Sequence, residues 1–300
     1  MERLLGWEEH RLPNYKFIRE VGAFQFAYRT AVRQFYKRFL RREHQLRLPG
    51  GETLWLPVSS HFASEVFITQ CDVDWGSEAL LLSLLDGRGA FLDIGANIGY
   101  YSLLAASKCP AVYSFEPDPR ALGGLRRNID GNAKITLVPL AVGGACGMGS
   151  FTLESDCEVS HLSDGESRGS RIEVEITTVD AFTSLHGIHV EAIKIDAEGQ
   201  DIAVLRGAMS TLTGQMPIVL TECSPDAELF ELTRSAGYRV FAYLRQPETR
   251  ERSFAELLAG VPIAGETKML FLIPEQQTSR ILANDKLLAG ATRKGRMQGR

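Results

Sequence analysis

The chain has 300 residues, of which 44% are hydrophobic and 23% are charged, and its formal net charge is −4. This composition supplies enough apolar side chains for one large α/β domain with an N-terminal extension. The acidic balance argues against a nucleic-acid-binding protein, because such proteins carry a basic excess. A protein that binds small molecules fits the composition better.

The five cysteines are an odd number, are widely scattered and show no C-x-x-C spacing. Such a set predicts neither a disulfide framework nor a zinc site, and it indicates a reducing compartment. Residues 1–10 have no apolar core, and the longest apolar run, residues 79–85, is too short to span a bilayer. We therefore expect a cytoplasmic protein without a transmembrane segment.

Apolar residues recur every three or four positions over residues 21–42, which predicts an amphipathic helix in an N-terminal segment of residues 1–74. Its apolar side carries Phe24, Tyr28, Ala31, Val32, Phe35 and Phe39. Its other side carries Arg29, Arg33, Lys37, Arg38, Arg41 and Arg42. We expect the apolar side to pack on the main domain and the basic side to face solvent. A basic side that contacts anionic lipid or an acidic partner is the alternative, and a homo-oligomer stays open.

A strand is expected over residues 53–56 and a helix over residues 75–85. From residue 90 onward strands and helices alternate, which predicts a mostly parallel sheet with helices on both faces. The expected strands are 90–95, 111–116, 135–142, 191–196, 217–222, 238–244 and 267–273. The expected helices are 99–107, 118–129, 200–212 and 226–236. We assign residues 75–274 to this domain and residues 275–300 to a flexible basic tail.

The interval 143–177 interrupts this alternation. Two strand-like runs, 150–153 and 171–176, flank a polar loop rich in Ser, Asp and Gly. A loop of this length is often functional.

The most informative motif is FLDIGANIGYY at residues 91–101. An apolar strand ends in a turn with Gly95 and Gly99, and the helix that follows offers unpaired N–H groups to a ligand. Asn97 stands where the dinucleotide fingerprint Gly-x-Gly-x-x-Gly has its second glycine, and Asp93 is poorly placed beside a pyrophosphate. A positively charged cofactor therefore fits this turn better than a nicotinamide dinucleotide.

A second acid, Glu116, ends the next apolar strand about 20 residues further on, where such folds hold a ribose. A carboxylate there accepts hydrogen bonds from both ribose hydroxyls. The backbone of Ala141 and Val142, after the third predicted strand, is a candidate for the adenine edge. Besides these three, the candidate cofactor-binding residues are Asp93, Gly95, Ala96, Asn97, Gly99, Tyr100, Pro117 and Asp196.

Six segments resemble, in order and spacing, the FkbM family of S-adenosylmethionine-dependent methyltransferases: FLDIGANIGYYSLLAA, VYSFEPDP, ITLVPLAVG, ITTVDAF, IKIDAEGQDIAVLRGA and PIVLTEC. The resemblance covers residues 75–274. It implies a class I methyltransferase fold, Rossmann-like, with a seven-stranded sheet whose last strand is antiparallel and inserted beside the sixth. It also implies S-adenosylmethionine as the cofactor and a hydroxyl of a sugar, polyketide or related metabolite as the methyl acceptor.

Three alternatives to this function are N- or carboxyl-methylation on the same fold, a non-catalytic cofactor-binding partner subunit, and a nicotinamide oxidoreductase. Asn97 and Asp93 count against the oxidoreductase, because neither suits a pyrophosphate. A non-catalytic copy would be expected to lack DIGANIG or IKIDAEG, and this chain has both.

Methyl transfer to a hydroxyl needs an in-line approach, exclusion of water and removal of the acceptor proton. The candidate catalytic bases are His161 in the polar loop and Asp196 and Glu198 at the end of the fourth predicted strand. Mg²⁺ held by Asp196, Glu198 and Glu222 is an alternative that we do not favour, because an acid at this strand end more commonly contacts cofactor or acceptor. Asp180 is expected to cap a helix.

Overall fold

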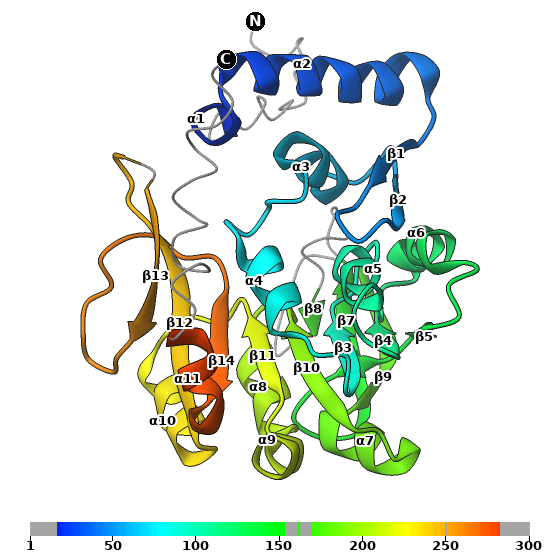
Figure 1. Cartoon of the computed structure of the whole chain (residues 1–300). Coiled ribbons are helices and arrows are strands. Elements are labelled where there is room, and N and C mark those ends of the chain that lie inside the picture. The colour runs from blue at the N-terminus through cyan, green and yellow to red at the C-terminus, as the bar shows by residue number, and fades with distance from the viewer. Residues whose placement is uncertain (1–16, 154–160, 163–169, 250, 283–300) are drawn as a thin grey trace, which may run out of the picture.

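In a computed structural model of the chain, residues 17–153, 161–162, 170–249 and 251–282 are described. The centre of the fold is an eight-stranded sheet (Figure 1). Its strands are β3 (Ala90–Ile94), β4 (Val112–Phe115), β5 (Ile135–Val138), β10 (Val190–Ile195), β11 (Ile218–Thr221), β12 (Tyr238–Arg245), β13 (Arg252–Leu257) and β14 (Leu270–Pro274). Their order in the sheet is β13-β12-β14-β11-β10-β3-β4-β5.

The five strands from β5 to β11 in this order run parallel, and β14 is inserted antiparallel between β11 and β12. This arrangement confirms the α/β fold and the inserted antiparallel strand that the family resemblance implies. The sheet has one strand more than expected, because β13 pairs antiparallel with β12 at the edge. Its sequence, RSFAEL, has no continuous apolar run, which is why apolar periodicity did not predict this strand.

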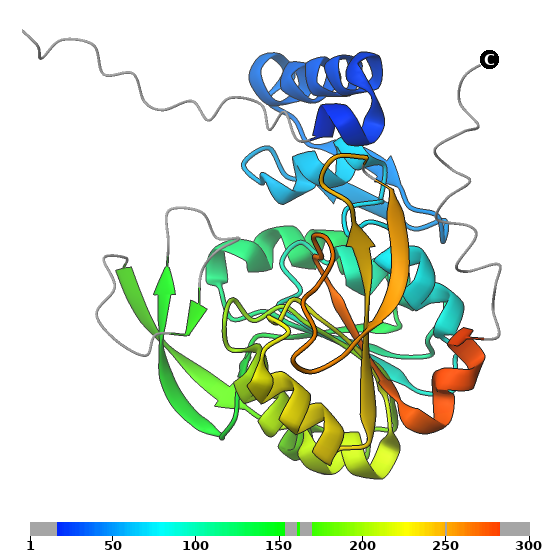
Figure 2. The same cartoon turned by 90° about the vertical axis from the view of Figure 1, so that its left-hand side faces the viewer.

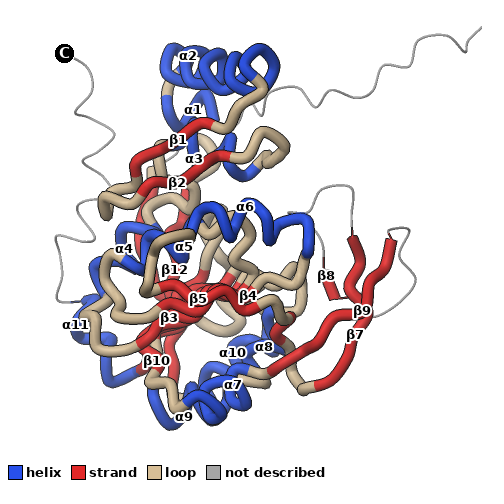
Figure 3. The backbone as a smooth tube through the Cα atoms, turned by 90° about the vertical axis from the view of Figure 1, so that its right-hand side faces the viewer, coloured by secondary structure: helices blue, strands red, loops and turns tan. Residues whose placement is uncertain are grey.

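Helices cover both faces of this sheet (Figure 3). One face carries α4 (Ser77–Leu84), α5 (Tyr100–Ala106), α6 (Pro119–Ile129) and α11 (Thr278–Leu282). The other face carries α7 (Val179–His186), α8 (Asp201–Arg206), α9 (Met209–Gln215) and α10 (Ala227–Ser235). Neighbouring strand residues alternate between the two cores, since Phe91 belongs to the first cluster and Leu92 to the second. Burial on both faces explains the apolar runs from which these strands were predicted.

Two predictions about helices are wrong: the continuous helix over 200–212 and the role of Asp180 as the cap of its own helix. The helix expected over 200–212 is divided after Arg206, at Gly207, the C-cap of α8, where the chain passes so close to other backbone that a Cβ would stand 2.3 Å from the carbonyl oxygen of Gly143. Asp180 does not cap its own helix, α7, whose N-cap is Thr178. Its carboxylate instead accepts hydrogen bonds from the backbone N–H groups of Ser210 (2.8 Å) and Thr211 (2.7 Å), at the start of α9. A threonine two residues earlier thus takes the predicted role.

A second, smaller sheet projects from one side of the main sheet (Figure 2). Its strands are β6 (Ala141–Val142), β7 (Gly147–Leu153), β8 (His161–Leu162) and β9 (Ser170–Thr177), in the order β6-β9-β7-β8. The strand expected over 135–142 is therefore two strands in different sheets. Pro139, which has no N–H to donate, stands between them.

The predicted strand-like runs of the interval 143–177 are confirmed as parts of β7 and β9, which pair antiparallel along seven residues of each strand. The loop that we expected between them is interrupted by β8. The rest of that loop, residues 154–160 and 163–169, lies outside the described residues.

The N-terminal segment consists of α1 (Ile18–Val21), α2 (Ala23–Gln34), a π-helix η2 (Phe35–Leu40), β1 (His44–Arg47), β2 (Thr53–Leu56) and α3 (Phe62–Thr69). The helix predicted over 21–42 is present but broken at Gly22, whose φ is 84°, and it ends before Arg41, whose φ is 49°. The strand predicted over 53–56 is confirmed. Leu54 and Leu56 lie in the same buried cluster as Phe91, so this segment shares a core with the main domain.

The structure reverses the predicted orientation of α2. Arg33, expected in solvent, is only 1% exposed, and its guanidinium donates to the carbonyl oxygens of Leu56 (3.2 Å) and Pro57. Arg29 donates to the carbonyl oxygen of Ile68 (2.6 Å), near the end of α3. These carbonyl groups need donors, which guanidinium groups supply and an aromatic stripe does not.

The aromatic residues of the predicted apolar side consequently face outward, although Val32 on that side packs against the core. The side chains of Phe24 and Phe39 are 79% and 78% exposed. Figures 1 and 2 both show α2 at the outer edge of the molecule.

The C-terminal tail predicted over residues 275–300 begins as ordered structure. A short 3-10 helix, η4 (Glu275–Gln277), leads into α11, where Ile281 is buried in the core. From residue 283 the tail lies outside the described residues. No helix in the described part of the chain is both long and apolar enough to cross a bilayer.

Glu78 of α4 is a buried acid that affects stability. One carboxylate oxygen accepts hydrogen bonds from the backbone N–H groups of Val73 (2.7 Å) and Asp74 (2.9 Å). Burial, and then the charge of Asp74, raise the pKa of Glu78 from 4.5 to about 8. Because the folded-state pKa is the higher one, the contribution of this group to stability is fully present below the unfolded-state pKa and is lost as the pH rises towards 8.

We expect Glu78→Gln to remove much of this pH dependence. The wild-type free energy of unfolding should fall between about pH 5 and about pH 8 by an amount on the order of a few kcal/mol, whereas the variant should change less. Urea unfolding midpoints at both pH values measure the difference, with Glu231→Gln at an exposed position as control. Equal slopes for wild type and Glu78→Gln would contradict this assignment.

Candidate functional site

The turn between β3 and α5 is built on three residues with positive φ, Gly95 (72°), Asn97 (48°) and Gly99 (83°). A Cβ at position 95 would stand 2.0 Å from the backbone carbonyl oxygen of Asp196, and one at position 99 would stand 2.8 Å from a side-chain carbon of Leu125. Gly95 is thus required by its backbone conformation and by the lack of space beside a fixed backbone atom, whereas Gly99 is favoured mainly by its positive φ, because the end of the Leu125 side chain can move. The turn is held directly against the end of β10.

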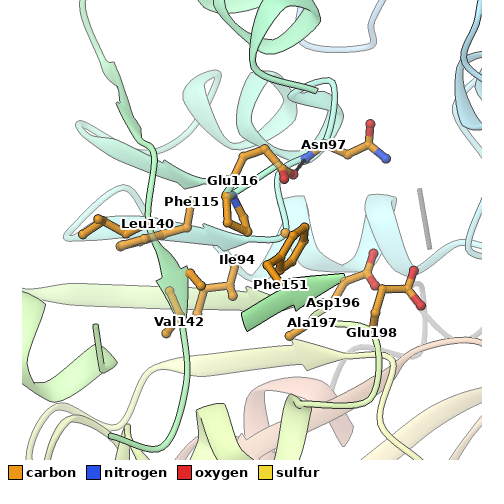
Figure 4. A pocket seen from close by; sticks show the side chains of 13 residues that line it. Ile94, Asn97, Phe115, Glu116, Leu140, Val142, Phe151, Asp196, Ala197 and Glu198 are labelled. Carbon is orange, nitrogen blue, oxygen red and sulfur yellow. Dashed lines mark hydrogen bonds between the residues drawn. The ribbon is translucent and has the colours of Figure 1, made fainter. Parts of the chain in front are cut away.

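A pocket opens at the carboxyl ends of β3, β4 and β10, between this turn and the second sheet (Figure 4). Its walls are Ile94, Gly95, Asn97, Phe115, Glu116, Pro117, Leu140, Ala141, Val142, Phe151, Asp196, Ala197 and Glu198. We refer to it as the strand-end pocket. Figure 4 shows the apolar side chains of Leu140 and Val142 on one side and the carboxylates of Asp196 and Glu198 on the other. Ligands of open α/β sheets bind at this position.

Most of the residues predicted to bind a cofactor line this pocket: Gly95, Asn97, Glu116, Pro117, Ala141, Val142 and Asp196. Glu198, a predicted base, lines it too. Asp93, Ala96, Gly99 and Tyr100 do not. The ring of Tyr100 points into the core, where its hydroxyl donates to Glu78 (3.3 Å) and its side chain is 1% exposed.

The sequence interpretation missed five residues of the pocket wall: Ile94, Phe115, Leu140, Phe151 and Ala197. Four of them are immediate neighbours of predicted residues, so their position at strand ends was a usable signal. Phe151 is different, because it lies on β7 of the second sheet and no periodicity in the sequence connects that strand to the pocket.

Glu116 holds the loop that surrounds it. Its two carboxylate oxygens accept hydrogen bonds from the backbone N–H groups of Asn97 (2.8 Å) and Asp118 (2.9 Å). Burial raises the pKa of Glu116 to about 7, although both backbone N–H groups oppose the rise. Each oxygen has a further lone pair, so the carboxylate can also accept hydrogen bonds from a ligand.

Lys194 of β10 contacts two acids, Asp196 in the wall of the pocket and the buried Asp93. Its ammonium donates to the carbonyl oxygen of Gly95 (2.9 Å) and to Asp196 (3.2 Å), and it lies 3.9 Å from Asp93. Burial lowers the pKa of Lys194, but the carboxylates of Asp196 and Asp93 outweigh it and leave the pKa raised. Asp93 is fully buried and accepts a hydrogen bond from Ser102 of α5. It therefore connects the end of β3 to the helix that follows the turn and does not face the pocket.

A second hollow adjoins the strand-end pocket and shares Asp196 and Glu198 with it. Its walls are Asp196, Glu198, Gly199, Asp201, Ile202, Glu222, Cys223, Ser224 and Asp226. We refer to it as the acidic hollow. Glu222 is exposed at its mouth, yet the surrounding walls partly desolvate the carboxylate, and this desolvation together with the charge of Asp196 raises the pKa of Glu222 to about 8.

The remaining predicted catalytic residue, His161, belongs to β8. The strand register pairs it with Thr152, the neighbour of the pocket residue Phe151. Its side chain lies outside the described part of the structure, so its role as a base stays a prediction. Among the described residues, no group of three or more His, Cys, Asp or Glu side chains is placed to hold a metal ion.

The model of the methyltransferase FkbM domain matches residues 93–246 of this chain. The chain belongs to the FkbM methyltransferase family. The matched region begins at Asp93 and contains every predicted cofactor-binding and catalytic residue. The resemblance identified from the six sequence segments is thereby confirmed.

Solved structures of other methyltransferases are similar to the FkbM-family chain at low identity. The methyltransferase FkbM from Methylobacillus flagellatus is 17% identical over 86% of this chain and 60% of that chain, with a TM-score of 0.39. The S-adenosylmethionine-dependent methyltransferase from Agrobacterium tumefaciens is 11% identical over 78% of this chain and 70% of that chain, with a TM-score of 0.42. The chain thus spans 60% of the length of the first of these structures. No curated protein matches it.

The strand-end pocket fits S-adenosylmethionine, the cofactor of this family. Asn97 contributes a buried side-chain oxygen that accepts no hydrogen bond from any described residue, which suits the ammonium group of the cofactor. Glu116 follows β4, at the strand end where folds of this kind hold a ribose, and Phe115, Leu140 and Val142 form an apolar wall that suits an adenine ring.

We expect Glu116→Gln to weaken binding of S-adenosylmethionine by about 1.5 to 3 kcal/mol, the range for hydrogen bonds to a charged group. Wild-type affinity should also fall as the pH drops below about 7, because the carboxylate is then protonated. The glutamine variant should lack this dependence. Calorimetric titration on both sides of that pH measures both effects, with Asp130→Asn at an exposed position as control. An unchanged affinity would show that Glu116 holds only the loop.

Proposed function

We propose that this FkbM-family protein transfers the methyl group of S-adenosylmethionine to a hydroxyl group of a sugar, polyketide or related small metabolite. The observation that carries this proposal is the sharing of Asp196 and Glu198 between the strand-end pocket and the acidic hollow. The first cavity fits the cofactor and the second is open to an acceptor, so carboxylates stand where the two ligands would meet. Carboxylates accept a hydrogen bond from a hydroxyl and can take its proton.

When bound, S-adenosylmethionine supplies an electrophilic methyl group on a sulfonium. The chain itself has to orient the two ligands and exclude water. Glu116 would bind the ribose, and Gly95 and Asn97 the amino-acid part. Phe151, from the second sheet, contributes an apolar ring to the wall of the pocket.

We assign the removal of the acceptor proton to Glu222, with His161, Asp196 and Glu198 as the candidates predicted from the sequence. A general base works best when its pKa lies near the working pH, and the raised pKa of Glu222 meets this condition. Asp196 is fixed by its ion pair with Lys194, which suits a group that orients the acceptor.

Charge distinguishes the acceptor classes. The acidic hollow carries five Asp and Glu residues in its wall, so it repels a carboxylate acceptor. This wall attracts an amine, and N-methylation is therefore the second candidate.

We also propose a reducing, cytoplasmic compartment, which is supported by free thiols at Cys71, Cys109, Cys146 and Cys223.

The test of this proposal is transfer of a labelled methyl group from S-adenosylmethionine to three panels of small acceptors, namely polyhydroxylated, amine-bearing and carboxylate-bearing compounds. We expect label on hydroxyl oxygens, and much less label at sub-saturating S-adenosylmethionine with Gly95→Ala as the control enzyme. Label on amines alone would contradict O-methylation and show that the protein is an N-methyltransferase. Label on carboxylates alone would contradict the role given to the acidic hollow.

A further inference from the structure

The outer side of α2 and η2 carries a row of large apolar side chains that no described element covers. The row consists of Phe24 (79% exposed), Tyr28 (60%), Phe35 (50%), Phe39 (78%) and Leu40 (43%). Phe35 and Phe39 stack on each other with ring centroids 5.6 Å apart, so they form a continuous surface. Rows of large exposed apolar residues mark contact surfaces rather than ordinary solvent-facing helices.

The helix is firmly attached by its opposite side, so the exposure is a property of the fold. Phe26 is 6% exposed and packs in a small cluster with Phe17 and Ile68. Arg33, in turn, anchors the helix to backbone carbonyl groups at the end of β2. Buried Arg33 and half-buried Arg29, which donates to the carbonyl oxygen of Ile68, fix the rotation of the helix and direct its aromatic side outward.

The segment that carries this apolar row is also positively charged. The sequence from residue 21 to residue 42 contains six Lys or Arg residues and no Asp or Glu, although the whole chain has a net charge of −4. Arg38 lies between the stacked residues Phe35 and Phe39 in the sequence, Arg41 and Arg42 follow them, and all three arginines are exposed. We call the apolar row and these three arginines the aromatic–basic face.

We propose that the aromatic–basic face docks the protein on the surface of an anionic phospholipid bilayer, with α2 and η2 lying in the plane of the interface. Aromatic and aliphatic side chains would enter the boundary between head groups and acyl chains, where aromatic rings are favoured. The guanidinium groups would bind the phosphates and the negative surface of the leaflet.

A second copy of the chain is a poorer occupant of this face. If two such faces were in contact, the arginines of one copy would meet the arginines or uncharged residues of the other. No Asp or Glu could pair with them, because residues 21–42 contain no acidic residue. The charges would repel across that interface, whereas an anionic bilayer compensates them. The charge pattern therefore favours lipid over self-association.

The test is flotation of the full chain with vesicles of phosphatidylcholine alone and with vesicles that also contain phosphatidylserine. We expect binding that depends on phosphatidylserine and falls with salt. Phe35→Ser combined with Phe39→Ser, and Arg38→Glu combined with Arg42→Glu, should each reduce the partition coefficient by at least about tenfold. All four positions are exposed, so folding and S-adenosylmethionine affinity should stay as in the wild type.

Matched controls carry the same changes elsewhere on the surface. Leu185→Ser removes an apolar side chain that is 80% exposed, and Arg126→Glu combined with Arg234→Glu reverses two exposed charges. Neither should change vesicle binding. Absence of wild-type flotation, or equal loss in the control variants, would overturn the proposal. A dimer that Phe35→Ser combined with Phe39→Ser dissociates, without vesicle binding, would assign the face to a second copy.

Discussion

Gly95→Ala is expected to weaken binding of S-adenosylmethionine at least about tenfold, which equals about 1.4 kcal/mol. The added Cβ would lie 2.0 Å from the carbonyl oxygen of Asp196, a distance that no rearrangement of a side chain can relieve. The end of β10 must therefore move away from the turn. Asp196 and Lys194 would move with it, and both the strand-end pocket and the acidic hollow would lose their shared wall.

The matched control for this variant is Gly131→Ala. Gly131 has nearly the same backbone conformation, with φ of 76° against 72°, but a Cβ there meets no atom within 4 Å. Both variants carry the strain of an alanine at positive φ, about 1–2 kcal/mol. Only Gly95→Ala should lose cofactor affinity, as measured by calorimetric titration. Equal affinities for the two variants would contradict the role of the β3–β10 contact.

Glu222→Gln is expected to lower the rate of methyl transfer by at least about 100-fold, the lower end of what a positioned base contributes. The sign of the pH dependence follows from the raised pKa. Below about pH 8 the carboxyl group is mostly protonated and cannot take a proton, so the wild-type rate should increase as the pH rises through that value. The glutamine variant should lose this limb of the profile.

The control for Glu222→Gln is Glu228→Gln, at an exposed position on α10 that pairs with Arg206. Its rate and pH profile should match the wild type. Steady-state rates with a hydroxyl acceptor, measured across this pH range, separate the two variants. A normal rate for Glu222→Gln would show that Glu222 is not the base and would leave His161, Asp196 and Glu198 as the candidates.

Much of the wall of the strand-end pocket could be predicted from the sequence because its signals are local. β3 and β4 are buried on both faces, so they appear in the sequence as apolar runs that end at residues with special chemistry. Gly95 and Gly99 mark the turn, and Glu116 lies at the expected distance along the chain. The positions of Asp93 and Tyr100 were harder, since neither burial beneath the turn nor the direction of a helical side chain follows from spacing.

The second sheet and the N-terminal helix could not be predicted, because long-range contacts decide both. Phe151 reaches the pocket only through the pairing of β7 with β9, which joins residues far apart in the sequence. The amphipathic pattern of α2 correctly indicates two chemically different sides. It does not indicate which side is buried, because the carbonyl groups bound by Arg29 and Arg33 come from other elements.

The central claim is that the strand-end pocket binds S-adenosylmethionine, and calorimetric titration of the wild-type chain with S-adenosylmethionine and, separately, with NAD tests it most directly. Any co-purified ligand has to be removed first. We predict micromolar binding of S-adenosylmethionine with one site per chain and no binding of NAD. Absence of S-adenosylmethionine binding, or a preference for NAD, would contradict the account.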